Sequence, residues 1–168
     1  MPKSISILFL FLMFGCCTDL KEKEKMEKEN LRRAESYVEI IWNNKDVDSL
    51  NKFFSSNFVR NVNNIDMASD NSELAANIHN LFIAFPDLHL TIDHIKASEE
   101  MVLIDFNIKG TNTGPYGDLG VTGKKVDVNG LSRIDFDENG KIIHETIYYN
   151  ELSLLQQLGY ELNEPKID

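Results

Sequence analysis

The period of the apolar residues changes once along this chain, at Pro86. Before it, apolar side chains recur at the spacing of amphipathic helices. We expect three such helices, at residues 31–44, 47–54 and 72–84. After Pro86, apolar and polar residues alternate, which is typical of strands with one buried face. We expect these strands at residues 88–93, 102–108, 126–136 and 141–149.

Short local signals mark the ends of these elements. Asn71 or Ser72 is expected to cap the third helix. The polar, Asn-rich residues 61–71 are interpreted as a loop. Asp137-Glu138-Asn139-Gly140 is typical of a hairpin turn, and residues 151–158 predict a last short helix. Helices followed by an antiparallel meander predict an α+β fold.

The 168-residue chain is acidic, with a formal net charge of -10 at pH 7 and a pI near 4.8. Its length predicts one domain. A nucleic-acid partner would need a basic surface, so we expect none. His89 and His94 are expected on opposite faces of one strand, where they cannot share a metal ion. The glycines between residues 110 and 123 lack the Gly-Lys-Ser/Thr ending of a phosphate loop, and we expect neither metal nor cofactor.

The N-terminus carries a short apolar run at residues 5–14, after Lys3 and just before Cys16. The run has the length of the apolar part of a secretory signal and is too short to span a membrane. Its end resembles a bacterial lipobox, which predicts a signal peptide at 1–15 and a lipid on Cys16. The chain would then be an envelope lipoprotein, anchored to a membrane and facing the periplasm or the exterior. A buried first element and an ordinary secretory peptide remain as alternatives, and the role of Cys17 is unexplained.

A charged segment of mixed sign follows at residues 16–30. It offers no apolar face for docking, so we interpret it as a solvated tether. The folded domain is expected at 31–160, with a short tail at 161–168.

Four short motifs in the domain resemble those of the SnoaL-like polyketide cyclases, also called ester cyclases. They are Phe85-Pro86-Asp87, Gly110-Thr111 with Thr113-Gly114, Thr122-Gly123-Lys124, and Gln157-Leu158-Gly159. This family belongs to the nuclear transport factor 2-like superfamily, and the resemblance covers residues 31–159. It implies a cone, in which a curved antiparallel sheet wraps around three N-terminal helices and leaves a pocket at its wide end.

The resemblance also implies a reaction, an intramolecular aldol closure that needs a base and a donor to the developing oxyanion. The places that usually hold Glu, Trp and Asp on the last strand hold His144, Thr146 and Asn150 here. These residues share parity with Tyr148, so we expect this strand face to line the pocket. His144 is the candidate base.

Two further positions that often hold His in the family hold amides, Asn61 and Asn112. Amides form hydrogen bonds without titrating, which favours binding over proton transfer. We therefore predict a domain that binds a small, largely apolar molecule, with catalysis reduced or absent. An ester cyclase or isomerase that uses His144 is the first alternative. The second is a protein-partner module that forms a homodimer through the open face of the sheet.

Overall fold

The structure is a computed structural model that describes residues 5–163, with side chains described from Leu20 onward. The signal peptide, the side chain of Cys16 and the end of the tail lie outside the described side chains. The elements follow in the order α1 (Ile5–Tyr37), η1 (Val38–Asn43), η2 (Val47–Ser49), α2 (Leu50–Phe53), β1 (Phe54–Val62), β2 (Ile65–Ala68), α3 (Asn71–Ala84), β3 (His89–Ser98), β4 (Met101–Thr111), β5 (Lys125–Phe136), β6 (Ile142–Tyr149) and α4 (Glu151–Leu158).

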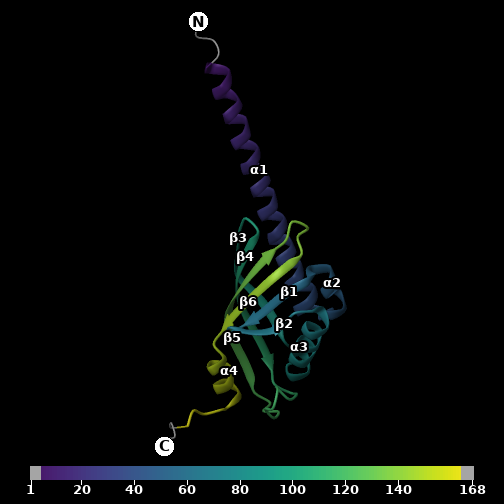
Figure 1. The fold of residues 1–168 in the computed structure, drawn as a ribbon. Coiled ribbons are helices and arrows are strands. Elements are labelled where there is room, and N and C mark those ends of the chain that lie inside the picture. The colour runs from purple at the N-terminus through teal and green to yellow at the C-terminus, as the bar shows by residue number, and fades with distance from the viewer. Residues whose placement is uncertain (1–4, 164–168) are drawn as a thin grey trace, which may run out of the picture.

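A single curved sheet of six strands forms one layer, in the order β2-β1-β6-β5-β4-β3 (Figure 1). The α+β fold predicted from the sequence is confirmed, and so are the four strands after Pro86. The prediction of a wholly antiparallel sheet is wrong, because β1 pairs with β6 in parallel. The sheet is therefore mixed.

Strands β1 and β2 replace much of the loop predicted at residues 61–71. They form an antiparallel hairpin whose turn residues, Asn63 and Asn64, both have positive φ angles of 50° and 67°. Asn adopts this left-handed backbone more readily than most residues, so the Asn-rich stretch is a tight hairpin turn. Its polar composition concealed two short strands.

Helix α3 begins at Asn71 and its N-cap is Asp70, so the prediction of Asn71 or Ser72 as the cap is wrong. The Asp70 carboxylate accepts hydrogen bonds from the backbone N–H groups of Ser72 and Glu73. These donors have no partner within the helix, so the cap satisfies them.

The core lies between the inner face of the sheet and the helices. Tyr37 and Ile41 at the end of the first helical stretch and Leu74 and Ile78 on α3 are fully buried against it. Gly130 on β5 allows one close contact, because a Cβ there would lie 2.3 Å from the ring of Phe106. Glycine at position 130 therefore leaves the space that the Phe106 ring occupies.

Helix α1 runs without a break through the predicted domain boundary at residue 30, and projects beyond the sheet at the end where the β3–β4 and β5–β6 turns lie (Figure 1). It contacts the β3–β4 turn through polar groups. Lys23 Nζ lies 2.6 Å from Glu99 Oε1. The Glu27 carboxylate accepts a hydrogen bond from the backbone N–H of Glu99, and the buried Asn30 side chain donates one to the Glu99 carbonyl. The segment interpreted as a solvated tether is therefore in part docked. Across the part of the chain that the structure describes, no helix combines the length and the apolar content needed to cross a membrane.

Candidate functional site

A cavity of about 300 Å³ lies between the inner face of the sheet and the helices η1 and α3. Its walls are mostly apolar, and much of them comes from alternate residues of β4 and β5, including Ile104, Phe106, Val126 and Val128. These residues point inward because strand side chains alternate between faces. The loop after β4 and helix α4 border the cavity through Tyr116, Gly117 and Leu154.

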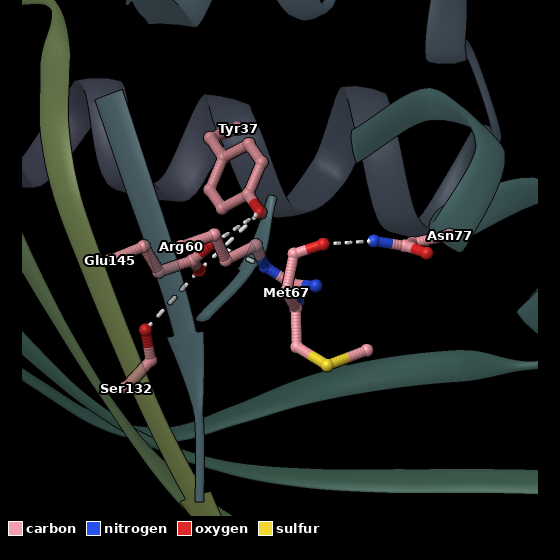
Figure 2. A network of polar contacts seen from close by, with 6 residues as sticks. All are labelled: Tyr37, Arg60, Met67, Asn77, Ser132 and Glu145. Carbon is pink, nitrogen blue, oxygen red and sulfur yellow. Dashed lines mark hydrogen bonds and ion pairs between the residues drawn. The ribbon is translucent and has the colours of Figure 1, made fainter. Parts of the chain in front are cut away.

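One cluster of polar side chains interrupts this apolar lining (Figure 2). Arg60 on β1 and Glu145 on β6 form an ion pair, with 2.8 Å between Arg60 Nε and Glu145 Oε2. Their side chains are only 6% and 3% exposed. The Tyr37 hydroxyl, from the end of α1, donates to Glu145 at 3.1 Å, and Ser132 Oγ on β5 donates at 3.3 Å. Three elements, α1, β1 and β5, thus each place a donor against one carboxylate of β6.

Arg60 is fixed in position on two sides. Its Nε donates to Glu145, and its guanidinium carbon lies 5.4 Å from the ring centre of Trp42, in cation–π geometry. Within residues 20–163, the two terminal nitrogens of Arg60 have no hydrogen-bond partner. Arg60 lines the cavity, so these N–H groups are available to a bound molecule.

The electrostatics of the cluster keep its donors protonated. Burial raises the pKa of Tyr37 well above its ordinary value, and the negative charge of Glu145 raises it further. Burial alone would lower the pKa of Arg60, but the charge and hydrogen bond of Glu145, together with Tyr37 and Tyr149, raise it above its ordinary value. Tyr37 therefore acts as a neutral hydroxyl donor and Arg60 as a permanent cation.

A second pair of hydroxyls lies elsewhere in the lining of the cavity. The oxygens of Tyr116 and Tyr149 are 3.4 Å apart. Burial raises the pKa of Tyr149, and the hydrogen bond with Tyr116 adds to this. Tyr149 is held from β6, whereas Tyr116 belongs to the loop between β4 and β5, so this contact links that loop to the sheet.

The predicted strand face does not line the cavity. His144 and Tyr148 are exposed on the outer face of the sheet, Thr146 is half-buried there, and the inward positions are Glu145, Ile147 and Tyr149. The Tyr148 hydroxyl donates a hydrogen bond to Asn64 Oδ1 in the β1–β2 turn. The parity prediction is therefore wrong.

A β-bulge explains the change of face. Phe136 on β5 pairs with Ile142, but the next residue back, Asp135, pairs with His144, so Ile143 is an extra residue in β6. An extra residue shifts the two-residue period by one position. Ile142 faces the core, and after the bulge the inward series continues at Glu145 instead of His144.

The three amides expected at the pocket serve the fold instead. Asn112 is fully buried, donates to the carbonyls of Ala84 and Gly114, and accepts two hydrogen bonds from Thr122. Asn150 is the N-cap of α4 and accepts from the Ser153 N–H. Asn61 donates to Asp66 across the β1–β2 hairpin. None of these amides lines the cavity.

Sequence reasoning missed Arg60 and Glu145. Arg60 lies in a segment with too few apolar residues to suggest a strand. Glu145 occurs in the series Ile143, Glu145, Ile147, Tyr149, which is otherwise apolar, so an acidic residue in an apolar alternation was the signal. The cation that pairs with Glu145 could not be identified from the sequence, because Arg60 lies 85 residues away along the chain.

The remaining expectations concern metals and partners. Among the described residues, no three His, Cys, Asp or Glu side chains gather into a group that could hold a metal ion. The outer sheet face exposes Leu131, Ile143 and Tyr148. A homodimer through this face stays a prediction.

The sequence profile described as SnoaL-like polyketide cyclase matches residues 32–158, which is most of the chain. The chain belongs to this family. No curated protein sequence matches it significantly.

Solved structures share the fold of this SnoaL-like domain. A SnoaL-like protein from Jannaschia sp. CCS1 superposes with a TM-score of 0.74 at 17% identity, covering 82% of this chain and 96% of that one. AclR from Streptomyces galilaeus, provisionally described as a hydroxylase, gives 0.72 at 24% identity, covering 83% and 87%. An LEH-like epoxide hydrolase from M. tuberculosis gives 0.61 at 15% identity, covering 79% and 90%. At these identities the similarity establishes the fold and leaves the chemistry to the site itself.

Proposed function

We propose that the cavity binds a small, largely apolar molecule that carries one acceptor oxygen, such as a carbonyl, and that Arg60 holds this oxygen. The observation that carries the proposal is a fixed cation with uncommitted N–H groups inside a largely apolar cavity. A volume of about 300 Å³ is at the lower end of the range for small-molecule sites.

The Arg60 guanidinium is preorganised for binding. Glu145 and Trp42 hold the guanidinium before a ligand arrives, so little side-chain entropy is lost on binding. A charged donor in a largely apolar site forms a strong hydrogen bond to a carbonyl. The apolar walls contribute the hydrophobic part of the affinity without requiring one exact ligand shape.

A second candidate, proton-transfer chemistry at the same site, is favoured by the position of Glu145. The amides that suggested lost catalysis lie outside the cavity, so that reason no longer applies. Glu145 can accept a proton from the carbon next to a carbonyl, while Arg60 stabilises the enolate oxygen. The family description, polyketide cyclase, is consistent with such a step.

Binding and turnover can be separated with one ketone probe, 2-tetralone. Trp42 is the only tryptophan of the chain and lines the cavity, so its fluorescence should report binding. Arg60→Met should abolish the signal, whereas His144→Ala on the outer face should leave it unchanged. Equal loss in both variants would contradict the proposed site.

Exchange of the probe's α-protons in D₂O, followed by NMR, tests the second candidate. Catalysed exchange that Glu145→Gln removes would make Glu145 the base. Binding without exchange would leave a binding domain. Exchange that survives Glu145→Gln but not His144→Ala would restore His144 as the base and refute this assignment.

We also propose that the domain is anchored to the bacterial envelope by a lipid on Cys16. The support is the sequence alone, an apolar run followed by Gly15 and Cys16. Cys16→Ser should release the protein from the membrane fraction or leave it unprocessed. Unchanged membrane retention of that variant, with Cys17 intact, would refute the assignment.

A further inference from the structure

A second hollow, on the outside of the molecule, gathers positive charge in this acidic chain. It measures about 310 Å³ and lies where α1, α2 and the β5–β6 turn meet. Four of its lining residues are cationic, and none is acidic: Arg32, Arg33, Lys52 and Lys141. The chain has a formal net charge of -10 and therefore many carboxylates that could pair with these cations. None of those within residues 20–163 lines the hollow.

None of these four cations pairs with an acidic side chain that the structure describes. Arg33 Nη1 donates to the Asn139 carbonyl, and Lys141 Nζ donates to two carbonyls of α2. These bonds position the side chains and leave their charge uncompensated. The nearby carboxylate of Asp137 accepts backbone N–H groups of its own turn instead.

The β5–β6 turn is shaped to fit this arrangement. Gly140 has a φ of 71°, and a Cβ there would lie 0.9 Å from Arg33 Nη1. Only glycine therefore lets the guanidinium lie against the turn. Ser36 adds a hydroxyl, and Phe53 and Phe136 give the hollow an apolar component.

We propose that this hollow binds a phosphate group attached to an apolar body. A phosphate carries up to two negative charges and several acceptor oxygens, which match several cations without counter-ions. The two phenylalanines would contact the attached group. The site is separate from the cavity and does not depend on the function proposed for it.

Two sources could supply this chemistry, a soluble phosphate ester or a phospholipid headgroup. Arg32 follows Cys16 by sixteen positions on α1, which corresponds to about 24 Å along the helix. If the helix stood upright on a membrane, the hollow would lie beyond the range of surface charge, about 8 Å at physiological salt. A headgroup could reach it only if α1 lay along the surface, so the test needs a vesicle arm.

The test uses the full chain, produced without acylation, and phenyl phosphate as the soluble probe. Calorimetry at low ionic strength should show binding at one site. Arg32→Gln and Lys141→Gln should each raise the Kd about tenfold, the loss of one charged hydrogen bond. Arg32 forms no hydrogen bond that the structure shows, so its substitution should leave the fold intact. Lys96→Gln, an exposed lysine on β3, changes the net charge equally and should leave the Kd unchanged.

The vesicle arm compares cosedimentation with phosphatidylglycerol and with phosphatidylcholine. Preference for phosphatidylglycerol that Arg32→Gln removes identifies a headgroup as the source, and phenyl phosphate binding alone identifies a soluble ester. Both results support the site. Binding to neither, or equal weakening by Lys96→Gln and Arg32→Gln, would overturn it.

Discussion

Arg60 and Glu145 carry opposite charges in a place where water scarcely reaches them. Moving two charges out of water costs more than a surface ion pair returns, so such pairs contribute little net stability. The pair in this cavity is nevertheless completed by Tyr37 and Ser132, which donate to the same carboxylate. The proposed binding of a ligand therefore accounts for this cluster better than a contribution to stability does.

Removing one partner of the pair should be costly. Glu145→Leu leaves Arg60 as an unpaired buried cation, and we expect the free energy of unfolding to fall by about 3–5 kcal/mol. The double variant Arg60→Met/Glu145→Leu should recover to within about 1 kcal/mol of the native chain, because no charge is then stranded. Urea unfolding followed by Trp42 fluorescence measures both. A double variant as unstable as the sum of the single ones would mean that the two residues act independently.

Asp87 should make the stability depend on pH. Its carboxylate accepts hydrogen bonds from the Thr111 hydroxyl at 2.7 Å and from the Thr111 N–H at 2.6 Å, and these bonds lower the pKa of Asp87 below its ordinary value. Because the pKa of Asp87 is lower in the folded state, the stabilisation by its ionised carboxylate is fully present above the unfolded pKa of about 3.9. It is lost as the pH falls through the lower, folded value.

The measurement is unfolding by urea between neutral pH and the acid range. Thr111→Val removes the side-chain donor and should flatten the fall in stability on acidification. Thr91→Val, an exposed strand substitution elsewhere, is the control and should leave the pH dependence as it is. An unchanged dependence in Thr111→Val would exclude this hydrogen bond as its cause.

At the scale of the element, the period of the apolar residues predicted most of the helices and the four strands after Pro86. It failed where local backbone geometry overrides it. The extra residue Ile143 in β6 has no signature in composition, yet it exchanges the face of every residue that follows it. Strand β1 was missed because its inward positions include a charged residue, Arg60, whose partner could be found only in three dimensions.

The assignment of Asp70 as the N-cap of α3 can be tested with the neighbouring residue Asn71 as the control. Asp70→Ala removes the acceptor for two backbone N–H groups and should lower the free energy of unfolding by about 1 kcal/mol. Asn71→Ala, at one of the two cap positions expected from the sequence, should change it by only about 0.3 kcal/mol. The opposite ranking in urea unfolding would return the cap to Asn71.

At the scale of the whole molecule, helix α1 joins the N-terminal region to the domain without a flexible break. The docked part begins where Lys23, Glu27 and Asn30 meet the turn at Glu99. Glu99 has a φ of 55°, so these polar contacts hold a turn residue in a left-handed conformation. The domain therefore extends further toward the N-terminus than its apolar pattern suggests.

Two truncations locate the boundary. A chain lacking residues 1–19 keeps all of these contacts and should unfold at the same urea concentration as the full chain. A chain lacking residues 1–30 loses them and should be less stable by about 1 kcal/mol, mainly through the part-buried bond of Asn30. Asn30→Ala in the full chain should reproduce much of this loss. Equal stability of the two truncated chains would restore the boundary at residue 30.

The parallel pairing of β1 with β6 also determines when the sheet can be completed during synthesis. Residues 54–62 leave the ribosome long before Ile142–Tyr149, and β1 has only the short β2 as a neighbour until then. Closing so long a loop is entropically slow, so the final sheet waits for the last strand. We therefore expect a nascent chain of this protein to stay incompletely folded until almost all of it has been made.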